Sequence, residues 1–593
     1  MKSNLKKSFC TLAAFIVGAS VFGAPSFDVD RAVVVKYAKP SNGTQDQWGP
    51  LNCHDPKIFQ DDDGTYYVYS TDASIGGAGE KGLQIRKSKD LINWESQPRS
   101  AIQNQWDRDW VKWVFYKQAY KSSWAPTVIK QNGLYYMYHG IITDGRNPGY
   151  PDASITFAIA SSPLGPFYPA AKAAKKDPKI KEVLDSLGVS YKQSTLVRYC
   201  YEDRSMSIDA DEALSMETLY NTGYYDTNNE ESGDFASLAY GFGCIDPEFV
   251  MDVATGKLME YTIGGRKCYA VTYGSWKGGI ALMYVDAVSL KAVDREGNEL
   301  DVPADTVEGA FGKCIGGGYG AAYEGAQVIF NKDTGYYYLF VSMGNLDYEY
   351  RVGVGRSKSI EGPYIDAGGR SMLFGPMDGQ DYHAIGSKII GAHELKGEYS
   401  FRCQGGESIL RTADGKIVMA VHSRTNFLPG YFFFLQIHQM FFNEDGWPVI
   451  NENEYYNDFN GKDEGLNKLS VSEIAGTYDA ILTVRDNEEG RFTPFGSTDS
   501  FQVHITDATP TPSKDLTLNE DGTIGGNNYS GKWTLAEDGY SITINLDGIG
   551  TFKGYVLNAV DWARKNAKGS HRTITFTTLD STKTGEYFWG NKR

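Results

Sequence analysis

Short apolar and aromatic runs, separated by tight polar turns, recur along most of the chain. The first such unit consists of residues 57–59, a polar turn at 61–64 and residues 65–70. Two short apolar runs joined by a polar turn that contains Asp-Gly predict a β-hairpin. Asp55, which precedes Pro56, is therefore expected at the beginning of a strand that a hairpin holds in a sheet.

The same unit returns four more times, at residues 124–139, 245–276, 324–341 and 406–422. The spacings are very roughly 70 to 120 residues, which indicates radial repetition. A small sheet cannot bury both faces alone, whereas sheets stacked around an axis cover one another. The repeat predicts an all-β fold that begins with a five-bladed β-propeller.

Insertions make the spacing uneven, and the largest extends from about Tyr168 to Tyr240. It contains a short helical pattern with Asp177 as N-cap, Pro178 at the first helical position and Gly188 just past the last. We expect a short helix there.

A second β-rich part follows the repeats. The composition turns polar near residue 458, and the remaining sequence contains eight short strand-like runs with Asp-Gly turns at 521–522 and 538–539. Such a pattern predicts a small closed β-barrel or sandwich. The predicted domains are therefore the propeller at 24–458 and the C-terminal domain at 459–593.

Residues 1–23 have the pattern of a secretory signal peptide. Three lysines precede an apolar run at 9–22, which ends in a small-residue cleavage site. This run is too short to span a bilayer, and no other stretch is long and apolar enough. We expect a secreted or periplasmic protein with no membrane span.

The formal net charge of −16 excludes one class of partner. Nucleic acid calls for basic patches, so no nucleic-acid binding is expected, and a neutral ligand fits better. Six cysteines remain after cleavage and are dispersed without CxxC spacing, which argues against a metal cluster. Disulfides are compatible with an exported protein, but the sequence does not assign pairs.

Alignment of the five units places one residue of each in register. These residues are Asp55, Ala125, Asp246, Gly325 and Gly406, with Glu324 directly before Gly325. The innermost strands of a propeller border its central channel, so equivalent strand starts meet at one mouth. We therefore expect Asp55, Asp246 and Glu324 to face a shared pocket.

Clustered carboxyl groups suit a particular chemistry. Like charges held together raise one another's pKa, and burial raises it further, so a carboxylate and a carboxylic acid coexist at one pH. Glycoside cleavage needs this combination. A single Asp before a strand is more often a cap or loop residue, but two Asp-Pro pairs and a Glu in register favour catalysis.

Aromatic side chains near these strand starts are candidates for substrate contacts. Sugar rings present apolar faces, which favours stacking by Trp124 over a purely structural role, and Trp276 is a further candidate. His54 is expected either to orient Asp55 or to bond to the backbone. Glu361 lies outside the register and is interpreted as a turn residue.

Together these motifs resemble glycoside hydrolase family 43, and within it the endo-α-1,5-L-arabinanases. The resemblance extends from about Pro25 to Tyr456. Its motifs are His54-Asp55-Pro56, Trp124-Ala125-Pro126, Ile245-Asp246-Pro247 and Tyr323-Glu324-Gly325, supported by residues 273–280 and 438–449.

The resemblance implies a five-bladed propeller, an inverting mechanism and a C-terminal β-barrel. By motif match, Asp55 is the general base, Glu324 the general acid, and Asp246 the residue that modulates the pKa of the acid. Arabinanases usually carry a His in the fifth unit that faces a calcium ion on the axis, and here Gly406 stands in that place. Calcium is therefore a candidate cofactor whose ligands are open, with Gln404, Glu407 and His383 as alternatives.

These observations lead to one main hypothesis, a secreted hydrolase that cleaves α-1,5-linked arabinofuranosyl bonds in plant cell-wall arabinan. The nearest alternative is a family-43 xylosidase or arabinofuranosidase that acts on xylan or arabinoxylan. A non-catalytic glycan-binding propeller is an alternative of another class, although a binding module has no need of three carboxylates.

Overall fold

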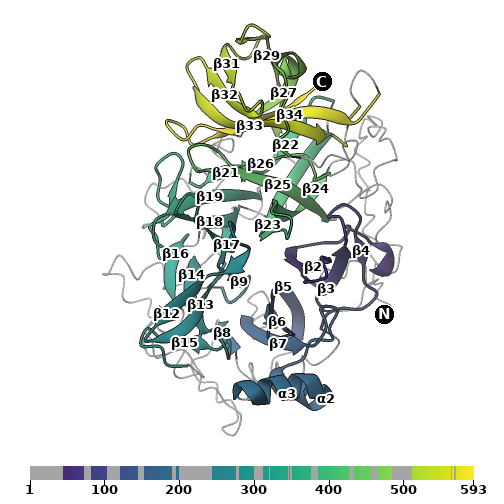
Figure 1. The fold of residues 1–593 in the computed structure, drawn as a ribbon, viewed down its shortest axis with the longest axis vertical. Coiled ribbons are helices and arrows are strands. Elements are labelled where there is room, and N and C mark those ends of the chain that lie inside the picture. The colour runs from purple at the N-terminus through teal and green to yellow at the C-terminus, as the bar shows by residue number, and fades with distance from the viewer. Residues whose placement is uncertain are drawn as a thin grey trace, which may run out of the picture.

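The computed structural model describes eighteen stretches of the chain. These are residues 45–72, 82–102, 120–143, 153–189, 195–199, 243–275, 279–299, 312–318, 321–344, 346, 350–374, 385–397, 399–425, 433–456, 465–483, 510–562, 564–565 and 569–593. Their strands form five open sheets and one closed barrel. The open sheets lie around a common centre in a propeller-like arrangement, and the barrel packs at one end (Figure 1). The fold is all-β, as the sequence predicted.

Each of the five predicted units supplies strands to a different open sheet, although residues 251–258 of the third unit pair with the fourth sheet. The first sheet has the order β1-β2-β3-β4 and the second β5-β6-β7-β8. Their bounds are β1 Lys57–Gln60, β2 Tyr66–Ser70, β3 Gln84–Ser88, β4 Glu95–Ser96, β5 Tyr120–Gln131, β6 Leu134–Thr143, β7 Ala153–Ala160 and β8 Thr195–Tyr199.

The third sheet has the order β12-β13-β14-β15, with β9 beside β13 and β16 beside β14. The fourth has the order β11-β10-β17-β18-β19-β20, with β21 beside β19. Their bounds are β9 Glu248–Phe249, β10 Met251–Asp252, β11 Lys257–Leu258, β12 Glu260–Ile263, β13 Arg266–Tyr273, β14 Ile280–Asp286, β15 Ala292–Val293, β16 Lys313–Gly316, β17 Tyr323–Asn331, β18 Tyr336–Met343, β19 Arg351–Ser357, β20 Ile365–Asp366 and β21 Ser387–Ile390.

The fifth sheet has the order β26-β25-β24-β23-β22-β28, and the barrel the order β27-β29-β30-β31-β32-β33-β34-β35. The sequence left barrel and sandwich open, and the structure has the closed barrel. The bounds are β22 His393–Leu395, β23 Tyr399–Arg411, β24 Ile417–Thr425, β25 Phe434–Phe442, β26 Pro448–Ile450, β27 Gly476–Thr483, β28 Thr511–Pro512, β29 Lys514–Leu518, β30 Thr523–Gly525, β31 Gly531–Leu535, β32 Ser541–Leu546, β33 Gly550–Val560, β34 Arg572–Leu579 and β35 Tyr587–Lys592.

The described helices are short: η3 Gln45–Gln47, α2 Ala170–Lys176, α3 Pro178–Leu187 and α6 Val471–Ile474. The predicted helix is confirmed as α3. The Asp177 side chain accepts a hydrogen bond from Lys179 N, and Gly188 ends the helix with φ +67°. None of the described helices is long and apolar enough to cross a membrane.

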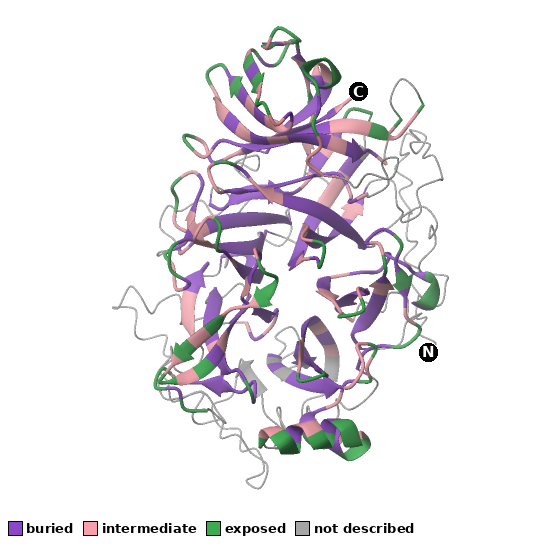
Figure 2. Cartoon of the chain, in the orientation of Figure 1, coloured by how far each residue is buried: buried purple, intermediate pink, exposed green. Residues whose placement is uncertain are grey.

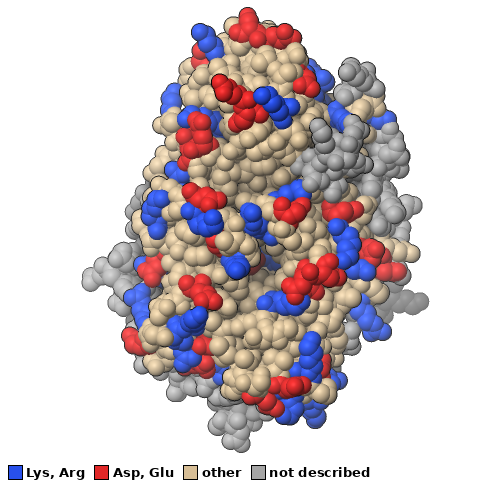
Figure 3. All heavy atoms as spheres, viewed as in Figure 1, with Lys and Arg blue, Asp and Glu red and all other residues tan. Residues whose placement is uncertain are grey.

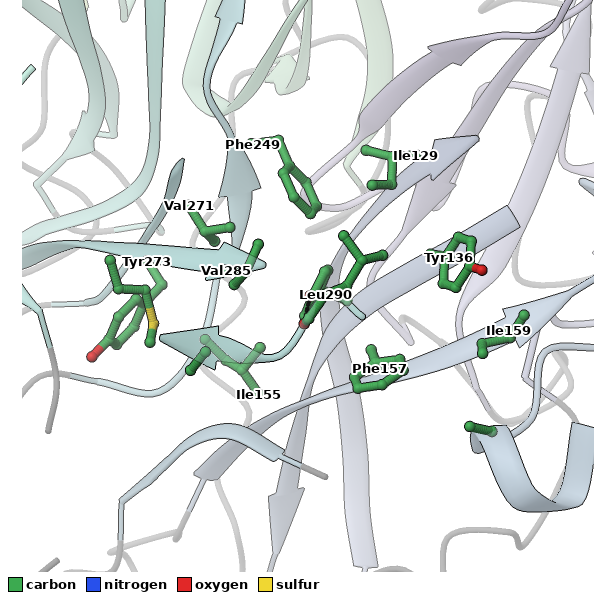
Figure 4. Close-up of a cluster of buried hydrophobic side chains, with 14 of the residues drawn as sticks. Ile129, Tyr136, Ile155, Phe157, Ile159, Phe249, Val271, Tyr273, Val285 and Leu290 are labelled. Atoms are coloured by element: carbon green, nitrogen blue, oxygen red, sulfur yellow. Dashed lines mark hydrogen bonds between the residues drawn. The ribbon is translucent and has the colours of Figure 1, made fainter. Parts of the chain in front are cut away.

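Apolar clusters fill the space between neighbouring sheets. One joins the second and third sheets, where Phe249 of β9 packs among Ile129, Phe157 and Leu290, and it also buries one face of α2 and α3 (Figure 4). The buried residues follow the sheets, while the outer faces of both helices are exposed (Figure 2). Each interface therefore depends on residues from two sheets.

The first and last sheets close the ring. Leu435 N donates to Pro50 O over 2.8 Å and Cys53 N to Phe433 O over 3.3 Å. Ile58 and Val68 share one apolar cluster with residues of β23, β24 and β25. Chain segments far apart in sequence thus meet at the segment that leads into Asp55.

The five register positions share an uncommon backbone conformation. The φ angles are +48° at Asp55, +36° at Ala125, +57° at Asp246, +65° at Gly325 and +62° at Gly406. Strand register is interrupted around three of these positions, in β5, β17 and β23. A bulge bends its strand and changes the direction of nearby side chains. The inner strands therefore kink at equivalent points.

Polar and aromatic contacts join the barrel to the last sheet. Tyr587 Oη donates to Pro448 O and Tyr555 Oη to Phe442 O, each over 2.7 Å. Asn453 and Asn591 exchange two amide hydrogen bonds of 2.8 and 2.9 Å while buried. β28 also pairs in parallel with β22.

Replacing Asn591 with Ala should destabilise this junction. The substitution leaves the buried Oδ1 of Asn453 without the donor that Asn591 supplies, which costs about 1–3 kcal/mol of unfolding free energy. Urea unfolding measures the change. Asn528→Ala, at an exposed barrel position, is the control and should stay within about 0.5 kcal/mol of the unsubstituted protein. Equal stability of the two variants would contradict this account of the junction.

Candidate active site

The structure brings Asp55, Asp246 and Glu324 together. Gly325 N donates to Asp246 Oδ2 over 3.0 Å, which joins the third and fourth sheets directly beside Glu324. The charges of Glu324 and Asp55 both act on Asp246, and Asp55 acts on Glu324. Three carboxyl groups from three sheets therefore share one site, as the register predicted; their roles are not tested by this geometry.

Asp55 is surrounded by groups that favour its ionised form. Thr71 Oγ1 donates to Asp55 Oδ2 over 2.6 Å, and His54 Nδ1 lies 2.9 Å from the same oxygen. His422 Nδ1 lies 3.6 Å from Asp55 Oδ1. Burial alone would raise the pKa of Asp55, but the two imidazoles and the hydroxyl outweigh it and hold the pKa below its usual value.

His422, which sequence reasoning missed, fixes the backbone of Asp55. Asp55 N donates to His422 Nδ1 over 3.1 Å. Burial, and then the neighbouring His54, lowers the pKa of His422 well below its usual value, so the ring is neutral. Because Nδ1 accepts this hydrogen bond, the proton of the neutral ring is on Nε2. The imidazole is therefore an acceptor that holds the kinked residue.

Three rings are stacked beside the carboxylates. The His54 and His422 rings are 4.5 Å apart with an interplanar angle of 12°, and the Tyr350 and His422 rings are 5.4 Å apart at 8°. Phe433 packs against His54 and His422, with centroids 4.5 Å away in both cases. This packing connects the surroundings of Asp55 to those of Glu324.

Glu324 receives two hydroxyl donors. Tyr350 Oη donates to Glu324 Oε1 over 2.7 Å and Ser275 Oγ to Oε2 over 2.9 Å. Burial, together with the charge of Asp55, raises the pKa of Glu324 in spite of these donors. Burial, followed by the charges of Glu324 and Asp55, raises the pKa of Asp246 well above its usual value. The site thus combines one ionised carboxylate with two groups that favour the protonated form.

Further buried polar groups lie close to these three. Lys57 Nζ donates to Glu407 O over 2.8 Å and lies 3.6 Å from Glu248 Oε2. Glu407 Oε2 accepts from Ser342 Oγ, which itself accepts from Gly406 N over 2.8 Å. Burial raises the pKa of Glu407 to about 7 against the opposing effects of Lys57 and Ser342.

The other predicted residues have varied surroundings. Trp124 is half-buried and packs against the cluster between the second and third sheets, and its role in substrate binding stays a prediction. Trp276 and His383 lie outside the described residues. Glu361 lies in a turn and forms a 2.9 Å ion pair with Lys313, which agrees with its interpretation as a turn residue.

Five of the six cysteines predicted to remain after cleavage are described. All five have free thiols: Cys53, Cys244, Cys268, Cys314 and Cys403. The sixth, Cys200, lies outside the described residues. Disulfide pairing therefore finds no support among the cysteines that the structure describes.

Four of the residues that sequence reasoning missed lie near the end of the second strand of a unit. Thr71 and Ser275 follow that strand by one and two residues, and Ser342 and His422 lie within its last four residues. Ser342 pairs with Glu324 across β17 and β18, and His422 pairs with Gly405 across β23 and β24. In the sequence, the available signal for these residues was a polar residue at or after the end of the second apolar run of each unit.

A metal ion at this site would have His54, Asp55 and His422 as ligands, with one ligand atom from each within 4.8 Å of the others. Calcium prefers about six to eight oxygen ligands, whereas this group offers one carboxylate and two imidazoles. Gln404 Nε2 donates to Gln436, and His422 Nδ1 already accepts from Asp55. The described residues fit calcium poorly, so calcium stays a prediction and no catalytic step is derived through it.

Comparison with known proteins identifies the family. The model of "Glycosyl hydrolases family 43" matches residues 49–224 and 296–448, and that of the family's "C-terminal lipocalin-like domain" matches 455–590. This chain belongs to glycosyl hydrolase family 43. Asp246 lies between the two matched segments of the first model, so its place in this family-43 site rests on the geometry above.

Two curated relatives are similar to this family-43 chain over most of its length. The extracellular endo-α-(1→5)-L-arabinanase of Thermotoga petrophila is 26% identical over 560 residues, which cover 91% of this chain and 93% of the relative. The extracellular endo-α-(1→5)-L-arabinanase 2 of Bacillus subtilis is 24% identical, with 91% and 93% covered.

Solved structures of the family share the fold. The endo-1,5-α-L-arabinanase from Thermotoga petrophila RKU-1 superposes with a TM-score of 0.62 at 23% identity, covering 93% of this family-43 chain and 100% of the other. A family-43 protein from Bacillus licheniformis has a TM-score of 0.61 at 22% identity, with 92% and 99% covered. The predicted domain boundary between residues 458 and 459 stays a prediction.

Substituting Gly406 should disturb Asp55. A Cβ at this position would lie 2.8 Å from His422 Nδ1 and 2.9 Å from Asp55 Cα, so Gly406→Ala must displace one of them. We expect kcat/KM for glycoside hydrolysis to fall at least about tenfold, a loss of about 1.4 kcal/mol in transition-state stabilisation.

The matched control is Gly64→Ala, which has φ +78° and nothing within 4 Å of the added Cβ. This variant experiences backbone strain alone, so we expect about 1–2 kcal/mol of lost stability and unchanged kcat/KM. Equal effects of both substitutions on kcat/KM would contradict the packing explanation.

Proposed function

We propose that this chain is a secreted or periplasmic inverting hydrolase that cleaves α-1,5-linked L-arabinofuranosyl bonds in arabinan, built on a five-bladed propeller. The observation that supports it most is the opposite pKa shift of Asp55 and Glu324 within one cluster of carboxyl groups. An inverting glycosidase needs one ionised and one protonated carboxyl group. The two arabinanase relatives, both named extracellular, support the substrate and the location.

In this proposal Asp55 is the general base. Its ionised carboxylate accepts a proton from a water molecule, which attacks the anomeric carbon from the face opposite the leaving group. The donors Thr71 and His54 hold the carboxylate in orientation, while the hydrogen bond from Asp55 N to His422 fixes the kinked backbone. Negative charge on Asp55 also helps Glu324 to keep its proton.

Glu324 is the general acid. Its raised pKa keeps the carboxyl group protonated, so it can donate a proton to the departing glycosidic oxygen. Tyr350 and Ser275 donate to its two oxygens, and these donors also stabilise the carboxylate that remains after proton transfer. Both therefore contribute to the step in which charge develops.

Asp246 acts on the acid in two ways. Through Gly325 N it fixes the backbone beside Glu324, and a negative charge on Asp246 would raise the pKa of Glu324 through like-charge repulsion. Its own raised pKa means that Asp246 and Glu324 titrate as a coupled pair. Trp124, Trp276 and His54 are the proposed contacts with the sugar rings.

Activity assays separate this proposal from its alternatives. Reducing-sugar release from linear arabinan should fall about 10²–10⁴-fold in Asp55→Ala and in Glu324→Ala, because each removes an acid–base group. Glu361→Ala is the matched control, since this exposed carboxylate pairs only with Lys313 among the described contacts, and its activity should stay unchanged.

The alternatives predict other outcomes. Cleavage of xylan or arabinoxylan without cleavage of arabinan would favour the alternative of a family-43 xylosidase or arabinofuranosidase. Wild-type protein as inactive as both variants on all pentose polymers would favour the glycan-binding propeller. Product lengths distinguish endo from exo cleavage, and the anomeric configuration of the first product tests inversion.

Tyr350→Phe should change the pH dependence in a defined direction. The hydroxyl stabilises the ionised form of Glu324, so its removal raises the pKa of this acid further. Since activity is lost as pH rises through that pKa, the basic limb of the kcat/KM profile should move to higher pH, with a lower maximum.

Thr71→Val provides the complementary comparison. Its hydroxyl holds the pKa of Asp55 down, and activity is lost as pH falls through that pKa. The acidic limb should therefore move to higher pH while the basic limb stays close to its wild-type position. An identical profile in both variants would argue against separate roles for Asp55 and Glu324.

A further inference from the structure

A second set of polar side chains lies inside the ring of sheets, one in each sheet. Its members follow the five register positions by two residues: Lys57, Thr127, Glu248, Gln327 and Ser408. We call these five residues the inner polar set. None of them is more than 6% exposed. Buried polar and charged side chains need partners, and the partners of this set come from other sheets.

Most contacts of the inner polar set join sheets that are neighbours in the ring. Thr127 Oγ1 donates to Glu248 Oε1 over 2.6 Å, which joins the second and third sheets. The side-chain amide of Gln327 accepts from Ile409 N over 2.6 Å and donates to Ile409 O over 3.3 Å, which joins the fourth and fifth sheets. These contacts hold each inner strand to the next.

Lys57 differs because its side chain reaches across the ring. It begins β1 of the first sheet, which packs against β5 of the second sheet and β23 of the fifth. Its Nζ donates to Glu407 O of the fifth sheet over 2.8 Å and lies 3.6 Å from Glu248 Oε2 of the third sheet. The second sheet lies between the first and the third (Figure 1). A side chain of the first sheet that meets the third therefore extends to the common centre.

The charge of Lys57 acts on carboxyl groups of two other sheets. On the face shown in Figure 3, acidic and basic side chains are interspersed at the surface, where water and salt screen them. Lys57 is only 2% exposed, so its charge is screened much less. Burial raises the pKa of Asp246 and of Glu407, and the positive charge of Lys57 opposes this effect at both groups.

A metal ion at the centre of the ring would have the same two tasks. It would compensate the charge of carboxyl groups and hold oxygen atoms of different sheets together. The described residues around Asp55 fit calcium poorly, whereas the ammonium group of Lys57 already lies among oxygen atoms of Glu407 and Glu248. An ammonium group is a compact point charge with three donors and no acceptor, so it can serve several oxygen atoms at once.

We propose that the ammonium group of Lys57 is the resident cation at the centre of this hydrolase, which therefore cleaves its substrate without a divalent metal ion. Lys57 is a positioning residue in this account. It fixes the strands and carboxyl groups behind the reacting pair and does not touch the substrate. The inference rests on the proposed hydrolase function and deepens it, and it excludes the predicted calcium as a requirement for activity.

Removal of metal ions from the wild-type protein is the first test. We expect kcat/KM on linear arabinan and the thermal midpoint of unfolding to be unchanged by EDTA and by millimolar calcium. A fall in either quantity that calcium reverses would overturn the proposal, because an ion bound to the folded state stabilises it. If the wild type cleaves no pentose polymer, the proposed function fails, while the thermal midpoint still tests the resident cation.

Lys57→Met is the second test, since it removes the charge and keeps a long side chain. We expect kcat to fall at least about tenfold with KM unchanged. The double variant Lys57→Met/Glu248→Gln should regain stability, because Glu248 is no longer a buried charge without its cation. Its kcat should stay low, since Asp246 and Glu407 still lack the positive charge. Recovery of kcat in the double variant would overturn the proposal, because Lys57 would then only neutralise Glu248.

Lys388→Met is the matched control. Lys388 is another buried lysine, on β21, and its charge acts on Glu452. This variant should lose stability and keep the wild-type kcat and KM. A fall in kcat equal to that of Lys57→Met would mean that the loss of any buried lysine impairs the protein, and the proposal would then be wrong.

Discussion

The active-site geometry depends on a left-handed backbone kink repeated at equivalent points, on or shortly before the inner strand of each sheet. An L-residue in this conformation costs about 1–2 kcal/mol, yet Asp55, Ala125 and Asp246 all adopt it. Strain of this kind persists only where the surrounding structure enforces it. A kink of this kind changes the direction of nearby side chains, and here Asp55 and Asp246, which both adopt it, meet in one site.

The same backbone position has two uses in this molecule. At Asp55 and Asp246 it presents a carboxyl group, whereas at Gly406 the missing side chain makes room for the imidazole of His422 against Asp55. Gly325 similarly offers its N–H to Asp246 and leaves Glu324, one residue earlier, as the group that reaches the site. Equivalent backbone positions therefore have a carboxyl side chain in some sheets and only a glycine in others. This difference makes the site asymmetric although the backbone repeats.

Sequence reasoning found this register because a repeat leaves a pattern along the chain. Asp-Pro directly before a short strand marks Asp55 and Asp246, and the cap residues Asp177 and Gly188 mark α3. Tyr350 gave no comparable signal and His422 only its place at the end of a second apolar run, since their relation to the carboxylates comes from strand pairing and ring stacking between distant segments. Choosing between barrel and sandwich likewise required the pairing of β27 with β35, which are separated by more than a hundred residues along the chain.

The site has more carboxyl groups than cationic groups, and this imbalance determines which carboxyl groups keep a proton. Among the described residues, Lys57 lies 3.6 Å from Glu248 and acts on Asp246 and Glu407, so ionisation of Asp55, Asp246, Glu324 and Glu407 together would leave uncompensated charge in a desolvated space. Some of these carboxyl groups must therefore keep their protons, and the hydrogen-bond donors around each group determine which ones do. His54 and Thr71 keep Asp55 ionised, whereas the donors to Glu324 do not outweigh its burial and the charge of Asp55, so the proton stays on Glu324. Because the site has too few cationic groups to balance all of its carboxyl groups, one carboxyl group stays ionised and another keeps its proton. These two are the base and the acid of the proposed reaction.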